Sequence, residues 1–165
     1  LGDVYKRQFL NSAHVVAGNN LTTTKAVAEV DSVAQLNPSK VFIMVGLNDV
    51  NFGSKSAEAI AEDLITLAGA VKDSCPSAKV YILSLLPVTS GFEARDTNKI
   101  TQSAIDDVND TVSVLAASAG YTYIDVASAY KNGAGYLNPD YSTNGMNLHH
   151  DYYAFLLNSI AEVAK

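Results

Sequence analysis

A short polar motif directly follows a buried apolar run in this sequence. The run Lys40–Val45 (KVFIMV) leads into Gly46-Leu47-Asn48-Asp49. Glycine permits backbone turns that other residues avoid, and polar side chains at the carboxyl end of a parallel strand are well placed to line a site. The Asn48 amide can donate a hydrogen bond to an oxyanion that forms during acyl transfer. The structural alternative is an Asx turn, in which Asn48 and Asp49 bond their own loop backbone.

The elements that would position this motif are predicted from apolar runs. Each run is short and rich in β-branched or aromatic residues, which is typical of a buried parallel strand. The four runs are Ala13–Ala17, Lys40–Val45, Lys79–Leu85 and Tyr121–Val126.

Between the runs, apolar residues recur at spacings of three and four, which predicts helices with one buried face. The three sets are Ala26, Val30 and Val33; Ile60, Leu64, Leu67 and Val71; and Ile105, Val108, Val112 and Leu115. Thr22 to Thr24 and Ser56 are N-cap candidates, and Gly120 is suited to end the third helix. We expect a final helix from about Asp151 to Ala164.

The alternation of strands and helices predicts a three-layer α/β/α fold with a doubly wound parallel sheet and right-handed crossovers. In such a fold the site lies at the carboxyl ends of the strands. The loops expected to form it are 18–22, 46–55, 86–96 and 127–150.

The phrase LNPSKVFIMVGLNDVN resembles the third conserved block of the SGNH/GDSL hydrolases, in which a buried strand ends in G-x-N-D. Upstream, VVAGNNLTT resembles the second block. The resemblance implies a flavodoxin-like fold and ester hydrolysis by a serine nucleophile. It also implies that the Gly18 N–H and the Asn48 side chain form the oxyanion hole. Gly46, Asp49 and His149 are expected to contribute to binding around them.

The resemblance continues downstream for over a hundred residues. YILSLLPV is similar to the fourth strand of the family, and YTYIDVASAY is similar to the last strand. The Asn109 side chain on the helix between them and the Asp125 side chain after the last strand are expected to brace loops rather than to act in catalysis.

The block before the final helix departs from the family pattern D-G-x-H-L. The aligned residues are Asn144-Gly145-Met146-Asn147-Leu148. An amide at Asn147 cannot accept the serine proton near neutral pH, and Asn144 lacks the charge that would stabilise an imidazolium. His149 or His150 is the alternative base, but a shift of two or three positions turns the side chain in another direction.

The nucleophile block also departs from the family, which has a strand ending in Gly-Asp-Ser. This sequence begins Leu1-Gly2-Asp3-Val4 and holds no Gly-Asp-Ser. We interpret residues 1–8 as a non-native N-terminal scar and residues 9–165 as the hydrolase-like domain without its first strand. No nucleophile is therefore assigned.

Composition limits the classes of partner. The 165 residues are 48% hydrophobic, enough for one domain with its own core. Eleven Lys and Arg against 17 Asp and Glu leave a net charge of −6, which disfavours nucleic acid as a partner. No apolar run is long enough to cross a bilayer, and no signal peptide is evident. We leave the compartment and the oligomeric state open, since a secreted parent protein fits the sequence as well.

Neither a metal nor a cofactor is expected. Cys75 is the single cysteine, and no Cys/His pairs at zinc-ligand spacing are present. No G-x-G-x-x-G follows the first run.

The sequence thus predicts an SGNH/GDSL-type domain for a small-molecule or glycan ester, with the chain as given inactive. Whether it is an enzyme stays open, because two other hypotheses fit. One is a non-catalytic pseudoenzyme that binds a glycan or an ester. The other is a gene fragment without an independent function.

Overall fold

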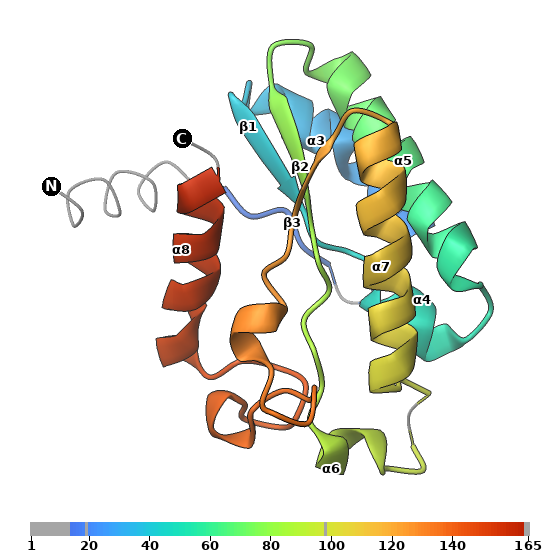
Figure 1. The fold of residues 1–165 in the computed structure, drawn as a ribbon. Coiled ribbons are helices and arrows are strands. Elements are labelled where there is room, and N and C mark those ends of the chain that lie inside the picture. Colours follow the sequence, from blue (N-terminus) through green and yellow to red (C-terminus); the bar gives the residue numbers. More distant parts are fainter. Residues whose placement is uncertain (1–13, 19, 98, 164–165) are drawn as a thin grey trace, which may run out of the picture.

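The computed structural model describes residues 14–18, 20–97 and 99–163 (Figure 1). Three parallel strands form its sheet in the order β1-β2-β3. Their bounds are β1 Lys40–Ile43, β2 Lys79–Leu83 and β3 Thr122–Ile124. Lys40 stands opposite Lys79, and Tyr81 stands opposite Thr122. The three later predicted strands are therefore confirmed, each slightly shorter than its apolar run.

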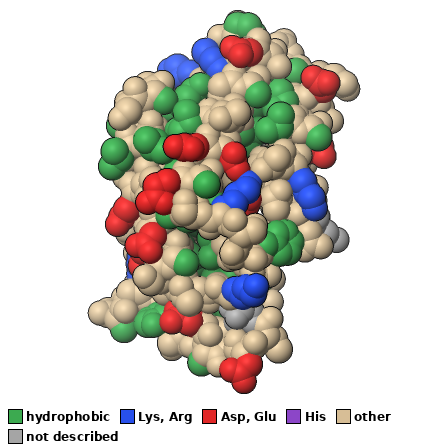
Figure 2. Space-filling model, turned by 90° about the vertical axis from the view of Figure 1, so that its right-hand side faces the viewer, with side chains coloured by type: hydrophobic (Ala, Val, Ile, Leu, Met, Phe, Trp, Pro, Cys, Tyr) green, Lys and Arg blue, Asp and Glu red, His purple; other side chains and the backbone are tan. Residues whose placement is uncertain are grey.

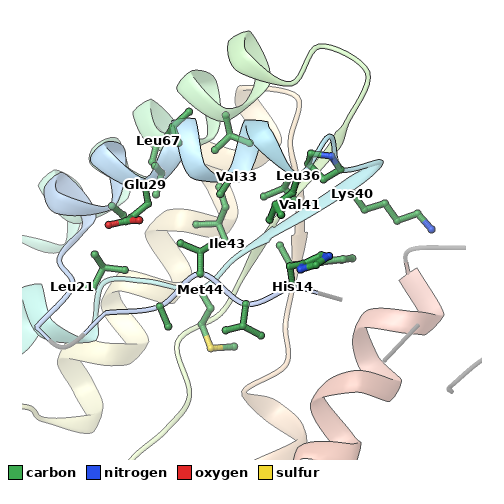
Figure 3. A pocket seen from close by; sticks show the side chains of 18 of the residues that line it. His14, Leu21, Glu29, Val33, Leu36, Lys40, Val41, Ile43, Met44 and Leu67 are labelled. Carbon is green, nitrogen blue, oxygen red and sulfur yellow. The ribbon is translucent and has the colours of Figure 1, made fainter. Parts of the chain in front are cut away.

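The first predicted strand is wrong over its described residues. His14–Ala17 forms no strand and is exposed. An apolar run becomes a strand only when a neighbouring strand supplies a ladder of hydrogen bonds, and no described strand pairs with this one. Instead, the segment and β1 line an open groove of about 810 Å³ together with α3 (Figure 3).

One face of the sheet is covered by helices that follow the predicted apolar spacing (Figure 1). They are α2 Thr23–Ala26, the 3-10 turn η1 Val27–Glu29, α3 Val30–Gln35, α5 Ala57–Ser74 and α7 Gln102–Ser118. Thr22 caps α2 by accepting from the Lys25 N–H, and Ser56 caps α5 by accepting from the Ala59 N–H. Asp and Glu side chains are spread over the outer face of α5 and α7 (Figure 2).

The opposite face is covered by α8 Tyr153–Val163, which lies across the sheet from α5 and α7 (Figure 1). Side chains along β2 point alternately to the two faces of the sheet. Val80 and Ile82 belong to the core under α5, and Tyr81 and Leu83 belong to the core under α8. Ile160 is the buried residue of α8. The architecture is a three-layer α/β/α fold with a parallel sheet.

Shorter helices occupy the loops at the carboxyl ends of the strands. They are α4 Leu47–Phe52, α6 Ser90–Glu93, η2 Ser128–Tyr130, η3 Pro139–Tyr141 and η4 His150–Tyr152. None of the helices in the described part of the chain is both long and apolar enough to span a membrane.

Two buried side chains fix the loop that follows β2. The Asn109 side chain accepts from the Leu85 N–H at 2.7 Å and donates to the Leu85 carbonyl at 3.0 Å. The Ser84 hydroxyl accepts from the N–H groups of Val126 and Ala127. Asp125 in turn accepts from the Ser128 N–H at 3.1 Å. The bracing roles predicted for Asn109 and Asp125 are thus seen in these contacts.

Candidate active site

A pocket of about 270 Å³ opens at the carboxyl ends of β1 and β2. It brings together Gly18, Gly46, Asn48 and Asn147, which come from three separate stretches of the sequence. The remaining lining residues are Val16, Ala17, Leu21, Met44, Val45, Leu47, Leu85, Leu86, Met146, Leu148 and Tyr153. The walls are therefore apolar, with a few polar groups among them, as in many small-molecule sites.

Gly46 makes the turn from β1 into α4. Its φ of 133° lies in a region that side chains avoid, and an added Cβ would lie 3.3 Å from the Ile60 side chain. The turn places Asn48 in the first turn of α4, where its Nδ2 donates to the Leu21 carbonyl at 2.9 Å. An amide NH₂ has two hydrogens, so this bond orients Asn48 and leaves a second donor.

Asp49 is buried, with 2% of its surface exposed, and does not line the pocket. Its carboxylate accepts from the Thr23 N–H and hydroxyl, each at 2.9 Å, and from Lys55 Nζ at 3.2 Å. These bonds tie the start of α2 to α4. These contacts suit Asp49 to hold the backbone next to Asn48 in position, whereas the sequence predicted that Asp49 contributes to binding.

Lys55 links the buried Asp49 carboxylate to a second, partly buried carboxylate. Its ammonium also contacts Asp63, which the Thr23 hydroxyl reaches at 3.0 Å. The hydrogen bond with Lys55 lowers the pKa of Asp63, and burial partly opposes the shift. The bond with Asp63 raises the pKa of Lys55, again against burial. The Lys55 network, defined as Thr23, Asp49, Lys55 and Asp63, thus favours the charged forms of both Asp63 and Lys55.

Asn144 and Asn147 lie in one tight loop but have different surroundings. The Asn144 Oδ1 accepts from the Met146 N–H at 3.0 Å and from the Asn147 N–H at 2.8 Å. The Asn147 carbonyl accepts from the Ser142 hydroxyl at 2.8 Å. Only Asn147 lines the pocket, so Asn144 acts as a brace for the loop that carries it.

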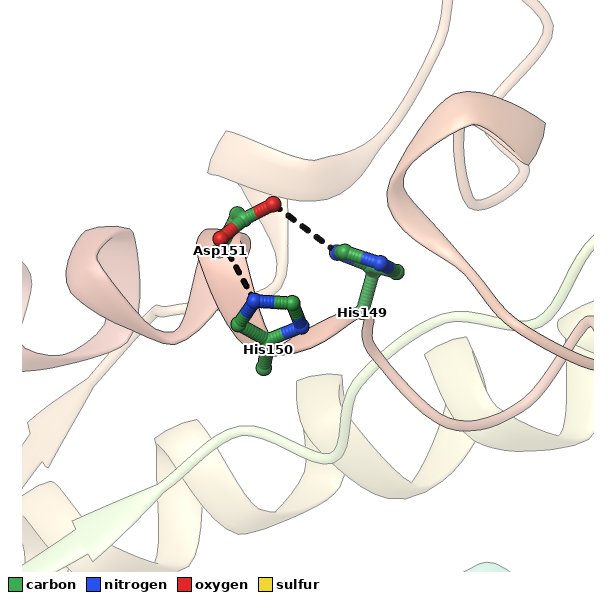
Figure 4. Close-up of side chains that lie close together, drawn as sticks. All are labelled: His149, His150 and Asp151. Atoms are coloured by element: carbon green, nitrogen blue, oxygen red, sulfur yellow. Dashed lines mark ion pairs between the residues drawn. The ribbon is translucent and has the colours of Figure 1, made fainter.

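The two neighbouring histidines lie outside the pocket lining. The His149 N–H donates to the Tyr141 carbonyl at 2.8 Å, and its Nδ1 lies 3.2 Å from an Asp151 oxygen (Figure 4). His150 Nε2 lies 2.9 Å from the other oxygen of the same carboxylate. Both imidazoles therefore face Asp151 rather than Asn48, and binding by His149 remains a prediction.

The described lining of the pocket has hydrogen-bonding groups but none of the serine, histidine or aspartate side chains with which the family resemblance implies catalysis. It contains no Ser, Thr, Cys, His, Asp or Glu, and its polar side chains are Asn48, Asn147 and Tyr153. Amides donate and accept hydrogen bonds but neither attack an ester nor accept a proton near neutral pH. Residues 1–8, interpreted as a scar, lie outside the described residues.

Sequence reasoning missed the Lys55 network and the place of Tyr153. Thr23, Asp49, Lys55 and Asp63 are up to 40 residues apart, and only the folded chain brings them together. A weak signal was available, because Lys55 lies just before the Ser56 N-cap of α5 and the oppositely charged Asp63 lies within that helix. No local sequence pattern predicts that Tyr153 lines the pocket.

One family model matches most of the chain. Residues 1–151 match the model of the GDSL-like lipase/acylhydrolase family. The fold resembles a GDSL-like lipase from Bacteroides thetaiotaomicron, with a TM-score of 0.78 and 21% identity over 98% of this chain and 81% of that chain. It also resembles a lipase/acylhydrolase from Enterococcus faecalis, with a TM-score of 0.71 and 19% identity over 98% and 83% of the two chains.

A curated relative matches part of a longer protein. The N-acylneuraminate cytidylyltransferase of Escherichia coli O18:K1:H7 (strain RS218 / NMEC) is 29% identical over 126 residues. This match covers 76% of the present chain but spans only 28% of the length of that relative. The family match over most of the sequence, together with the three-layer fold and the G-x-N-D turn, shows that the chain belongs to the GDSL-like lipase/acylhydrolase family.

Proposed function

We propose that this SGNH hydrolase domain binds an acyl or carbohydrate ester in the pocket between Gly18, Asn48 and Asn147, and that the chain as given does not turn it over. One observation carries the proposal. Gly18 and Asn48, the residues we propose for the oxyanion hole, line one pocket whose described lining contains no serine nucleophile and no histidine base.

The pocket suits the carbonyl end of a small ester. The second N–H of the Asn48 amide and the backbone N–H of Gly18 would donate to the carbonyl oxygen, and the bond from Asn48 to Leu21 holds the amide in place. The volume of about 270 Å³ lies just below the range of about 300–1,000 Å³ for small-molecule sites. We therefore expect short acyl groups to fit best against the apolar wall.

A binding function without catalysis is the second candidate, and Asn144 and Asn147 favour it. Asn147 would hold the position of the general base with an amide, which hydrogen-bonds a sugar hydroxyl or an ester oxygen without taking a proton. Neither His149 nor His150 lines the pocket to replace it. In this case the domain is a pseudoenzyme for a glycan or an ester.

Hydrolysis of p-nitrophenyl acetate tests the proposal with four proteins. They are the chain as given, a version in which a strand ending in Gly-Asp-Ser replaces residues 1–8, and the Asn147→His variant of each. We expect no turnover by the chain as given or by its Asn147→His variant. Turnover by both extended versions would mark a truncated esterase that tolerates Asn147. Turnover by the extended Asn147→His version alone would support the pseudoenzyme, and turnover by the chain as given would overturn the proposal.

The oxyanion-hole assignment is tested in whichever extended version is active. Asn48→Ala removes the donor, and we expect kcat to fall by about 10²–10³-fold, as for other oxyanion-hole amides. Asn158→Ala on α8, outside the pocket, is the matched control and should leave kcat unchanged. Equal activity of Asn48→Ala and the control would exclude Asn48 from the reaction.

If none of the four proteins hydrolyses the ester, binding is measured instead. Titration with a short-chain ester, followed by the amide NMR signals of residues 46–48 and 146–148, separates the two remaining hypotheses. Saturable shifts at these residues would support the pseudoenzyme. Their absence would leave a gene fragment without an independent function.

A further inference from the structure

Three consecutive side chains at the start of the last helix converge on one point. His149 Nδ1 and His150 Nε2 lie 3.2 Å and 2.9 Å from the two oxygens of the Asp151 carboxylate (Figure 4). One ligand atom from each of the three residues falls within 4.8 Å of the others. Two imidazole nitrogens and a carboxylate oxygen form a donor set that zinc accepts readily.

The backbone holds this cluster in shape. His149 precedes the 3-10 turn η4, and its N–H is anchored on the Tyr141 carbonyl at 2.8 Å while its carbonyl accepts from the Tyr152 N–H at 3.0 Å. The rings of His149 and His150 stand side by side, with centroids 4.3 Å apart. The turn η4 therefore brings neighbouring residues to the same side, whereas an extended chain would point them in opposite directions.

We propose that His149, His150 and Asp151 form a surface site for a divalent transition-metal ion such as Zn²⁺. In a tetrahedral zinc site, bonds of about 2.0–2.2 Å require ligand atoms somewhat closer than the present spread. The exposed side chains of His150 and Asp151, 80% and 66% accessible, can close this gap by rotation. Three protein ligands leave one coordination position for water.

The stretch of chain that carries the cluster, from Asn132 to Ala164, contains no Lys or Arg, while Asp140, Asp151 and Glu162 are acidic. No ion pair with a Lys or Arg is found for Asp151 among the described residues. The carboxylate is thus available to neutralise part of the charge of a metal ion. A bound ion would link the loop that carries Asn147 to the start of α8.

Titration of the untagged chain with ZnCl₂ by isothermal calorimetry tests the site. We expect one Zn²⁺ per chain and at least a tenfold weaker affinity in His150→Ala and Asp151→Asn, because the loss of even a supporting group around a metal costs 10- to 100-fold. His14→Ala removes an exposed imidazole that lies beside β1, away from the cluster, and serves as the matched control with unchanged affinity. MgCl₂ should give no comparable heat, because Mg²⁺ prefers oxygen ligands.

Imidazole NMR signals give a second measurement. Zn²⁺ should shift the ring signals of His149 and His150 and leave those of His14 in place. Circular dichroism of each variant shows whether the fold is kept, which we expect because His150 and Asp151 are exposed. Absence of zinc binding would overturn the proposal. Equal affinity of Asp151→Asn and the parent chain, or equal weakening by His14→Ala, would also overturn it and would indicate an adventitious ion only.

Discussion

Asp49 is a carboxylate with almost no contact with water, although it lies one residue from the amide proposed to bind the substrate. Such a charge is costly to bury unless donors surround it. Thr23 supplies two donors and Lys55 a third, so the charge is compensated by residues from two other segments. This arrangement makes Lys55 the part of the network that a single substitution can remove without creating a cavity in the core.

Lys55→Met should change how stability depends on pH. The pKa of Asp63 is lowered in the folded state, so its contribution is present above the ordinary carboxyl value of about 4 and is lost as pH falls through the folded pKa. The pKa of Lys55 is raised, so its contribution is present below about pH 10.4 and is lost as pH rises through the folded pKa. We expect the parent chain to be most stable between these limits.

Urea unfolding at several pH values from 3 to 11 measures this dependence. Both the acidic and the alkaline decrease in the free energy of unfolding should be smaller in Lys55→Met than in the parent chain. Lys25→Met, an exposed lysine on α2, is the control and should retain both decreases. Identical pH profiles for Lys55→Met and the parent chain would mean that the ion pairs add nothing to stability.

The loop that carries Asn147 depends on close contact with α6. Gly145 has a φ of 92°, and an added Cβ would lie 2.6 Å from the Thr89 hydroxyl and 2.7 Å from the Phe92 Cβ. The Gly145 carbonyl also accepts from the Thr89 N–H at 2.9 Å. The sequence block placed a glycine here, but its contact with α6 was not predictable because α6 lies some fifty residues earlier.

Gly145→Ala should destabilise the fold by about 2 kcal/mol or more, since the backbone strain and the steric overlap add. Two controls separate these causes. Gly135 has a φ of 83°, but a Cβ added to it would have no atom within 4 Å. Gly135→Ala therefore has only the backbone cost of about 1–2 kcal/mol. Gly133→Ala has neither feature and should stay within about 0.5 kcal/mol of the parent chain. Chemical denaturation measures all three, and equal losses in Gly145→Ala and Gly135→Ala would exclude the overlap.

Ile160 is the buried side chain by which the last helix packs on the sheet, with 5% of its surface exposed and the half-buried Leu156 packed against the same core. Ile160→Ala should cost about 2 kcal/mol, at the low end for such a truncation, because Ile160 also borders the open groove and part of the new space is already solvated. Val163→Ala, 48% exposed, is the control and should change little. Hydrogen exchange should show faster opening of α8 in Ile160→Ala, and unchanged exchange there would contradict this role.

Across the whole molecule, the sequence predicted what depends on local patterns. The later three strands, the caps at Thr22 and Ser56 and the glycine end of α7 at Gly120, with a φ of 80°, follow from short-range rules. The prediction of a strand at 13–17 was wrong over the described residues, because an extended run forms a strand only beside a partner strand. Whether a partner strand is present depends on the whole sheet. Contacts between residues far apart in the sequence also form the Lys55 network, and the fold leaves His149 outside the pocket lining; no local pattern predicted either.

Filling the groove beside β1 should give the largest change in the stability of the whole molecule. The groove has a volume of about 810 Å³ and is lined by Val15, which is 87% exposed, and by Leu36, which is 43% exposed. A strand placed here would give His14–Ala17 a hydrogen-bonding neighbour and bury these side chains, each of which contributes about 1.5–3 kcal/mol when fully buried. The version with a strand ending in Gly-Asp-Ser in place of residues 1–8 should therefore unfold at higher urea concentration and with a larger m-value, since it buries more surface. The same extension with two of its apolar residues changed to Asp should lose the gain, whereas equal midpoints for all three proteins would show that the groove does not accept a strand.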